Sequence, residues 1–357
     1  MKVNGQSYRS IWAEENPRRV HIVDQTRLPF AFATLTLSTR DEIAHAIRTM
    51  RVRGAPLIGV AAAFGMALAM HKDAGDASLD TSISTLLTTR PTAVNLRWAL
   101  ECVREKLAPL PTRERADAAW LLAKKLADDD VATNEAIGEH GLKLVRAMHE
   151  KLQRPVNILT HCNAGWLATV DWGTALAVIF KAHDAGIPVH VWVDETRPRN
   201  QGLLTAWELR GHGVPHTYIV DNAGGHLMQQ GRVDMVLLGA DRVSKNGDVA
   251  NKIGTYLKAL AAFDNGIPFY AAVPVSTIDS ALNDAIKEIE IEERAEMEVR
   301  AIAGLQTDNA REASPVLVVD RGTKVANPAF DLTPHRLVTA IITERGVFAP
   351  GELAASL

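Results

Sequence analysis

The chain has 357 residues, of which 47% are apolar and 23% charged, a composition typical of globular proteins with two or three domains. A formal net charge of −3 leaves no basic surface, so we expect no nucleic-acid partner. The two cysteines, Cys102 and Cys162, cannot form a disulfide framework, and no cysteine or histidine cluster has zinc-ligand spacing. The N-terminal residues lack the apolar stretch of a signal peptide, and the most apolar window, Leu57–Met70, is too short to span a bilayer. We therefore expect a cytoplasmic protein that does not bind membranes.

Helical patterns dominate residues 1–150. Short strand-like pieces come first, at Val20–Val23 and Phe32–Leu37. Segments rich in Ala, Leu, Arg and Glu, which are strong helix formers, then predict helices at Thr39–Met50, Gly59–Lys72, Thr92–Ala108 and Arg113–Leu152. The polar stretch Gly75–Thr89 is predicted to be a connector. We predict that residues 1–150 form a mainly α-helical domain with a small strand element.

Strands and helices alternate in residues 151–357. The expected strands are Val156–His161, Val189–Val193, Thr217–Val220, Val233–Leu238, Phe269–Val273 and Val316–Val319. Ala- and Leu-rich helices of crossover length lie between them. This alternation predicts a Rossmann-like α/β domain, with a parallel sheet flanked by helices on both faces.

Polar side chains follow five consecutive expected strands. Ligands of open α/β sheets gather outside the carboxyl ends of the strands, so these positions are the candidates for a site. They are Thr160–Gly165, Asp194–Arg197, Asp221–Asn222, Asp241–Arg242 and Pro274–Thr277. Chance explains one polar strand end, but five together favour a binding site.

The stretch Val233–Tyr256 combines several of these features. A buried strand ends at Gly239, Asp241 follows it, and Asn251 and Lys252 precede an expected helix from Ile253 to Phe263. An anionic ligand suits the amino end of such a helix. The alternative is an ordinary strand-to-helix turn in which Asn251 caps the helix. Asp241 is expected to be partly desolvated, which suits a general acid, or else to pair with Arg242.

Two further residues have a functional and a structural interpretation. Cys162 follows a buried strand and precedes a helix-like run, where the helix dipole would lower the pKa of its thiol. The alternative is a small buried hydrophobe. Arg53, before Gly54 and Ala55, could grip a phosphate, although a surface helix cap would look the same.

Common cofactor and hydrolase motifs are absent from the sequence. It contains no phosphate-binding GxxxxGKS/T loop, no GxGxxG after a first strand, and neither GxSxG nor HExxH. We therefore expect no cofactor and no metal. The residues by themselves predict an α/β enzyme that acts on a small anionic ligand.

A series of motifs resembles the methylthioribose-1-phosphate isomerase family, whose superfamily includes the regulatory α, β and δ subunits of the exchange factor for translation initiation factor 2. The resemblance extends from about Arg27 to Gly346. The motifs are Arg53–Pro56, Arg90–Leu96, Thr160–Gly165, Asp194–Pro198, Gln201–Gly202, Asp221–Asn222, Gly239–Arg242, Asn246–Asp248 and Asn251–Tyr256.

The resemblance implies conversion of 5-methylthioribose 1-phosphate to its ketose, 5-methylthioribulose 1-phosphate, in methionine salvage. It implies that Asp241 is the proton donor and that Cys162 is the second catalytic residue. It also implies a homodimer and a substrate-binding set made of Arg53, Gly54, Ala55, Arg90, Gln201, Asn251 and Lys252.

Some features differ from the family pattern. Trp166 stands where a small residue is expected, which predicts a different pocket near Cys162, and the stretch Gln201–Trp207 is one residue short. The alternatives are a sister isomerase acting on 5-deoxyribose 1-phosphate or ribose 1,5-bisphosphate, and a non-catalytic sensor of sugar phosphates or nucleotides. A NAD-linked dehydrogenase is disfavoured by the missing glycine motif.

Overall fold

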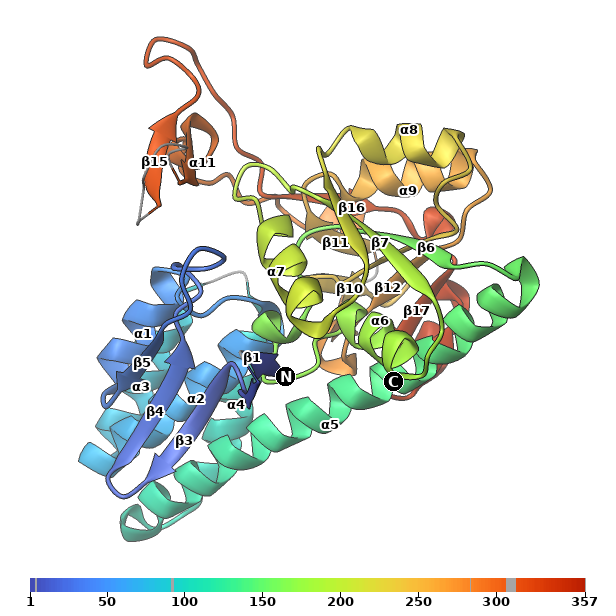
Figure 1. Ribbon diagram of the computed structural model, residues 1–357. Helices are drawn as coiled ribbons and strands as arrows, with labels where there is room; N and C mark the ends of the chain where they lie inside the picture. The colour runs from blue at the N-terminus through green and yellow to red at the C-terminus, as the bar shows by residue number, and fades with distance from the viewer. Residues whose placement is uncertain (4, 91–92, 283, 306–312, 357) are drawn as a thin grey trace.

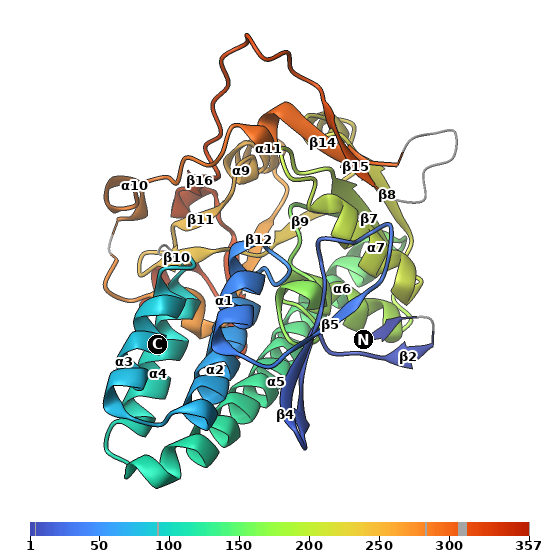
Figure 2. The ribbon, with the colours of Figure 1, turned by 90° about the vertical axis from the view of Figure 1, so that its left-hand side faces the viewer.

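The structure is a computed structural model that describes residues 1–3, 5–90, 93–282, 284–305 and 313–356 (Figure 1). Its N-terminal part begins with the pair β1 (Lys2–Val3) and β2 (Gln6–Ser7). A three-stranded antiparallel sheet follows, made of β3 (Ile11–Glu15), β4 (Arg18–Val23) and β5 (Thr34–Leu37). The next helices are α1 (Arg40–Arg48), α2 (Ala55–Lys72), α3 (Asp76–Leu87) and α4 (Val94–Leu107) (Figure 2).

Helix α2 forms the centre of this helical part. It contacts α1, α3, α4 and α5 (Thr112–Leu152), and its residues from Leu57 to Met70 are buried on all sides. The helix is long and apolar enough to cross a membrane by length and composition, but 78% of it is buried inside the protein. A helix that is apolar all round and enclosed by other helices is the core helix of a folded domain.

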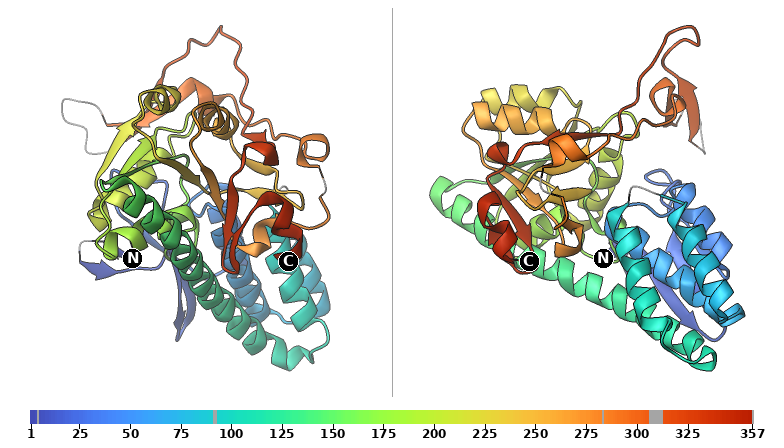
Figure 3. Two further views of the ribbon diagram at one scale, coloured as in Figure 1. Left: turned by 90° about the vertical axis from the view of Figure 1, so that its right-hand side faces the viewer. Right: turned by 180° about the vertical axis from the view of Figure 1, so that it is seen from behind.

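Helix α5 connects the helical part to the C-terminal sheet (Figure 3). Its first half packs into the helical core through Trp120 and Ala127, and its second half packs beside α6 through Ile137 and Val145. One helix therefore belongs to two hydrophobic cores, and the predicted domain boundary at residue 150 stays a prediction.

The C-terminal part is built on a seven-stranded sheet in the order β18-β17-β12-β9-β6-β7-β8. All neighbours are parallel except β17 and β18. The strands are β6 (Val156–Thr160), β7 (Val189–Asp194), β8 (His216–Ile219), β9 (Met235–Leu238), β12 (Phe269–Ala272), β17 (Ala340–Thr343) and β18 (Gly346–Phe348). This arrangement confirms the predicted Rossmann-like α/β class.

Helices cover both faces of this sheet. They are α6 (Ala175–Asp184), α7 (Gly202–His212), α8 (Ala223–Gln229) and α9 (Thr255–Asp264). Successive residues of β9 alternate between the two layers: Met235 and Leu237 pack with α6 and α7, whereas Val236 and Leu238 pack with α8 and α9. The continuous apolar run in the sequence follows from burial on both faces.

A second, four-stranded sheet lies beside the carboxyl edge of the main sheet. It contains β13 (Ile278–Asp279), β10 (Arg242–Ser244), β11 (Val249–Lys252) and β16 (Phe330–Thr333), in that order. The short helices α10 (Ala285–Glu288) and α11 (Met297–Arg300) follow β13. The hairpin of β14 (Ala301–Gly304) and β15 (Ser314–Leu317) extends away from the main sheet (Figure 1).

Three predictions about secondary structure were wrong. The expected connector Gly75–Thr89 contains α3, whose Leu79, Ile83 and Leu86 fill the helical core. The expected strand Val316–Val319 overlaps β15, which pairs with β14 and not with the main sheet in the described part of the chain. The main sheet instead contains β17, which was not predicted. Asn251 and Lys252 lie at the end of β11, so Asn251 is not a helix cap. Pro91 and Thr92, within the motif Arg90–Leu96, lie outside the described residues.

Candidate active site

A cavity of about 90 Å³ lies at the carboxyl ends of β6 and β9, facing the amino end of α2. Eight of the nine predicted site residues line it: Arg53, Gly54, Arg90, Cys162, Gln201, Asp241, Asn251 and Lys252. The ninth, Ala55, lines an adjoining cavity. Cys162 and Asp241, about 80 residues apart in sequence, thus face the same small space because parallel strands end at one edge of the sheet.

The backbone of Cys162 has a conformation that is unusual for a side-chain-bearing residue. Its φ is +64°, in the left-handed region, and its amide donates a hydrogen bond to Thr196 Oγ1 at 2.8 Å. Its carbonyl accepts one from Thr205 Oγ1, also at 2.8 Å. Two hydroxyls from neighbouring segments therefore hold the turn that directs Cys162 to the cavity.

The expectation that a helix dipole lowers the pKa of the Cys162 thiol was wrong. The turn Trp166–Ala168 is a single 3₁₀ turn, and the next α-helix, α6, begins only at Ala175. Burial raises the pKa of the Cys162 thiol, and the opposing effect of Arg53 and Lys252 does not reverse this. The side chain at the cavity is therefore a neutral thiol near pH 7.

A buried ion-pair network supports the cysteine turn from behind. Asp194, at the end of β7, accepts hydrogen bonds from His161 Nδ1 at 2.7 Å and Thr196 Oγ1 at 2.7 Å, and lies 2.6 Å from Lys258 Nζ. Burial alone would raise the pKa of the Asp194 carboxyl, but His161 and Lys258 outweigh it and lower the pKa to about 2. The network links β6, β7 and α9 beneath the site.

His161, Asp194 and Asp221 have ligand atoms within 4.8 Å of one another, close enough to hold a metal ion. These atoms already have partners. The Asp221 carboxylate accepts the amides of Thr196 and Arg197 at 2.9 and 2.8 Å, and His161 Nε2 faces the carbonyl of Ile253 at 2.9 Å. The positive charge that offsets Asp194 is supplied by the protein itself.

Arg53 reaches from the helical part to the sheet. Its Nη2 and Nη1 atoms donate to Asn163 Oδ1 at 2.9 and 3.1 Å. The next residue, Gly54, has φ +98°, and an added Cβ would lie 2.3 Å from the carbonyl oxygen of Ala168. Only glycine allows this close approach, which brings the arginine to the cavity.

The cavity is lined by cations, and the hydrogen-bond partners of Arg53 and Lys252 are neutral groups. Lys252 Nζ donates to the carbonyl of Ala329 at 3.0 Å and lies 4.6 Å from the centre of the Phe330 ring. Burial lowers the pKa of Arg53, Arg90 and Lys252. An anionic ligand would restore the solvation that these charges lose.

Asp241 lies half-buried between β9 and β10, and its amide donates to the carbonyl of Ala250 at 3.0 Å. The alternative expectation, that Asp241 pairs with Arg242, was wrong, because Arg242 Nε donates to Asp279 at 2.9 Å. Gln201 also faces the cavity: its side chain is 8% exposed, and its Oε1 has no hydrogen-bond partner in the described part of the chain. An unpartnered buried amide indicates a polar ligand.

The structure adds residues that the sequence did not indicate. Arg199, Arg294 and Phe330 also line the cavity. Arg294 comes from an irregular segment after α10, and no motif marked it. Trp166, expected to alter the pocket near Cys162, is buried in the core against Trp207 and does not line the cavity, which corrects that expectation.

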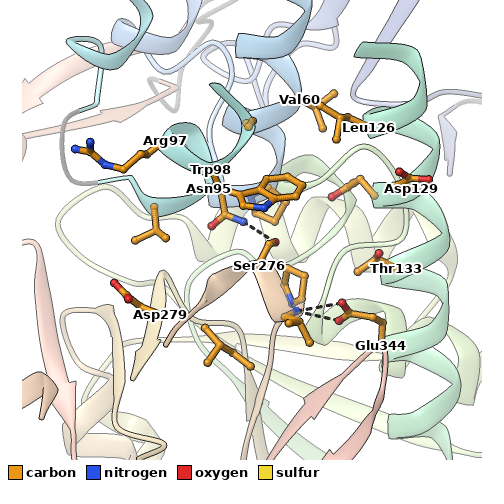
Figure 4. Close-up of a pocket in the computed structure, with 18 of the residues that line it drawn as sticks. Val60, Asn95, Arg97, Trp98, Leu126, Asp129, Thr133, Ser276, Asp279 and Glu344 are labelled. Carbon is orange, nitrogen blue, oxygen red and sulfur yellow. Dashed lines mark hydrogen bonds between the residues drawn. The ribbon is translucent and has the colours of Figure 1, made fainter. Parts of the chain in front are cut away.

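Two larger cavities lie nearby. One, of about 490 Å³, shares Gly54, Arg90, Asp241 and Phe330 with the first. The other, of about 720 Å³, lies between α4, α5 and the segment after β12, where Asn95 Nδ2 donates to Ser276 Oγ at 3.1 Å (Figure 4). It contains none of the predicted site residues. The end of β12, one of the five predicted strand ends, therefore contributes to a different cavity.

The fold and this cavity define an α/β protein with a cation-lined site, suited to a small anionic ligand, at the carboxyl edge of its sheet. A model of the initiation factor 2 subunit family matches residues 51–350. The chain is 60% identical over 356 residues to an Acidiphilium cryptum protein named methylthioribose-1-phosphate isomerase, covering 99% of this chain and 96% of that relative.

Solved structures agree. The crystal structure of 5-methylthioribose 1-phosphate isomerase from Pyrococcus horikoshii OT3 matches with a TM-score of 0.82 and 40% identity, over 98% of this chain and 95% of that one. The translation initiation factor eIF-2B, subunit delta, from A. fulgidus matches with a TM-score of 0.79 and 38% identity, over 97% of each chain. The chain belongs to the initiation factor 2 subunit family.

Proposed function

We propose that the protein is an aldose–ketose isomerase that converts 5-methylthioribose 1-phosphate to 5-methylthioribulose 1-phosphate in methionine salvage. The observation that carries this proposal is the convergence of Cys162 and Asp241 with the half-buried Arg53 and the buried Lys252 on one cavity. The names of the relatives at 60% and 40% identity support the same substrate.

The cations supply the phosphate site in this proposal. A sugar phosphate is a dianion near pH 7, and Arg53, Arg90 and Lys252 are charges whose desolvation already lowers their pKa. Gln201, Asn251 and the backbone at Gly54 and Ala55 complete the substrate-binding set. Arg294 and Arg199 are additions to that set, because they line the same cavity.

The chemistry begins with ring opening. A sugar phosphorylated at C1 has no free anomeric hydroxyl, so an acid must protonate the ring oxygen as the C1–O bond breaks. Asp241 supplies that proton, which remains on the new 4-hydroxyl group. The 2-hydroxyl proton is lost as the C2 carbonyl forms, and its transfer to the Asp241 carboxylate, directly or through water, returns Asp241 to its acid form.

Hydrogen then moves from C2 to C1, either as a proton through an enediol-type intermediate or as a hydride. We assign Cys162 to this step, either as the base or as a group that stabilises the developing charge. The raised pKa of its thiol favours charge stabilisation by the neutral S–H. Turnover in D₂O separates the two routes, because only the proton route places deuterium at C1.

The adjoining 490 Å³ cavity favours a 5-methylthio group over a 5-phosphate. Its lining includes the apolar Ile58, Val94, Ile289 and Ile291. Its charged lining is acidic on balance, because the carboxylates Asp241, Asp279, Glu288, Glu290 and Glu292 outnumber Arg90, Arg97 and Arg242, which disfavours a second phosphate. The sister substrate ribose 1,5-bisphosphate is therefore expected to react more slowly.

Incubation of the purified protein with three sugar 1-phosphates tests the function. Ketose formation is followed by NMR with 5-methylthioribose 1-phosphate, 5-deoxyribose 1-phosphate and ribose 1,5-bisphosphate. The first is expected to react fastest, and EDTA is expected to leave its rate unchanged. No ketose from any of them would favour a non-catalytic sensor or regulatory subunit.

The assembly, the location and the domain division are further parts of the proposal. We infer a homodimer, as the family resemblance implies, and a cytoplasmic location, as the composition and the N-terminal sequence imply. We also infer two domains, 1–150 and 151–357, since separate apolar clusters surround α2 and the main sheet. Analytical ultracentrifugation tests the dimer, and a monomer at micromolar concentration would contradict it.

A further inference from the structure

We propose that Glu208 is a positioning residue that orients the Asn163 side-chain amide and, through it, the guanidinium of Arg53 at the ligand cavity. The inference rests on the proposed function only for its kinetic readout. Glu208, on α7, does not line the cavity, and no sequence motif marked it.

The Asn163 amide has one orientation that satisfies all its neighbours. Its Nδ2 donates to Glu208 Oε1 at 2.8 Å and to Thr205 Oγ1 at 3.2 Å, while its Oδ1 accepts from Arg53 Nη2 and Nη1. Arg53 Nη2 also donates to the Asn163 backbone carbonyl at a longer 3.3 Å. Thr205 donates its own proton to the carbonyl of Cys162, so it can only accept from Asn163. A flipped amide would point its NH₂ at the guanidinium and its oxygen at the carboxylate.

The position of Glu208 is itself fixed. Its Oε2 accepts the amide of Trp166 at 2.8 Å, and its side chain is almost entirely buried. Gly165 makes room for the carboxylate, because an added Cβ there would lie 2.0 Å from Oε2. The backbone amide of Trp166 and the space at Gly165 therefore fix the carboxylate, whose other oxygen is left to accept from the Asn163 side chain.

A carboxyl at this buried position has an energetic disadvantage. Burial raises the pKa of Glu208 to about 7, although the hydrogen bonds from Asn163 and Trp166 oppose the shift. A packing role alone would be filled by an apolar side chain of similar size. A side chain that accepts hydrogen bonds on both oxygens also fixes the direction of the Asn163 amide. The amide oxygen then points at the Arg53 guanidinium and accepts its hydrogen bonds.

The test is a double-mutant cycle with Glu208→Gln and Arg53→Lys. Glutamine keeps the shape but replaces one acceptor by a donor, which then faces either Asn163 Nδ2 or the Trp166 amide. We expect Glu208→Gln to raise KM for 5-methylthioribose 1-phosphate about 10-fold or more, with a smaller change in kcat. In the Arg53→Lys background the same change is expected to alter KM less than about 3-fold.

Controls separate positioning from stability. Asp130→Asn changes a half-buried carboxyl that also accepts a backbone amide, that of Val170 at 2.7 Å, and it is expected to leave KM within about 2-fold of wild type. If Glu208→Gln does not fold by circular dichroism, Glu208→Asp, which withdraws the carboxylate by one methylene, replaces it. A wild-type KM in the folded variant, or an equal effect in both Arg53 backgrounds, would overturn the inference.

Titration with inorganic phosphate distinguishes failure of this inference from failure of the proposed function. If wild type turns over no sugar phosphate, the proposed function fails, and calorimetric binding of phosphate still measures the Arg53 site. Positioning is then supported if Glu208→Gln weakens phosphate binding when residue 53 is arginine but not in the Arg53→Lys background. Equal binding by both proteins, or none by wild type, would overturn it.

Discussion

The guanidinium of Arg53 and the side-chain oxygen of Asn163 join the helical part of the chain to the sheet, with Nη2 2.9 Å and Nη1 3.1 Å from Oδ1. The contact uses the fork of the guanidinium. Arg53→Lys keeps the charge but cannot donate two hydrogen bonds in this geometry. We expect KM for the sugar phosphate to rise roughly 10- to 100-fold with little change in kcat, as measured by steady-state kinetics. An unchanged KM would show that Arg53 does not bind substrate.

Cys162 and Asp241 line the same cavity, and both are assigned to the chemical step. Cys162→Ser and Asp241→Asn are each expected to lower kcat by about 10³-fold or more. Substrate binding, measured by calorimetry, should change far less, since neither side chain belongs to the cationic phosphate site. If both variants kept near-normal turnover, the assignment of acid and charge stabiliser would be wrong.

The same parallel-sheet rule that brings these two residues together explains what the sequence could predict. Strand ends at one sheet edge converge, so Cys162, Asp241 and the Asp194 network could be anticipated from apolar runs followed by polar residues. Asn251 and Lys252 were placed at the cavity correctly but on the wrong element. Two apolar residues, Val249 and Ala250, before a polar pair do not distinguish a strand from the start of a helix.

Other features depended on tertiary contacts that no local pattern encodes. Arg294 reaches the cavity from an irregular segment, where neither period nor motif marks a functional residue. The polar sequence of α3 hid the apolar positions Leu79, Ile83 and Leu86, which have helical spacing but few neighbours of high helix propensity. Strand β17 was missed although it is as long as β9 and β12, which their apolar runs did predict, so its length does not explain the omission.

The close approach of Gly54 to Ala168 leads to a prediction about stability. Gly54→Ala would introduce a Cβ 2.3 Å from the Ala168 carbonyl oxygen at a φ of +98°. We expect the free energy of unfolding in urea to fall by about 3 kcal/mol, from steric overlap and backbone strain together. The control is Gly211→Ala in α7, where the nearest atom lies 3.9 Å away and stability should rise by up to about 1 kcal/mol. Equal effects would contradict the close approach at Gly54.

Asp194 links stability to pH. Its pKa is lowered to about 2, so its ionised form stabilises the fold above the ordinary aspartate pKa, and this contribution disappears as pH falls towards 2. Asp194→Asn leaves His161 and Lys258 without their carboxylate and is expected to cost about 3–5 kcal/mol at pH 7. Urea unfolding should show the difference from wild type narrowing below pH 4. A difference that stayed constant down to pH 2.5 would show that Asp194 is not the ionised partner.

The raised pKa of Cys162 predicts an unreactive thiol in the free protein. Burial outweighs the effect of Arg53 and Lys252, so the thiolate fraction at pH 7 is smaller than that of an ordinary cysteine. The rate of alkylation by iodoacetamide at Cys162, followed by peptide mass spectrometry, should therefore keep increasing beyond pH 9. The Cys162→Ser variant reports the background at Cys102, whose pKa burial also raises. A plateau below pH 8 would mean an activated thiolate, and the base role for Cys162 would then replace stabilisation by a neutral thiol.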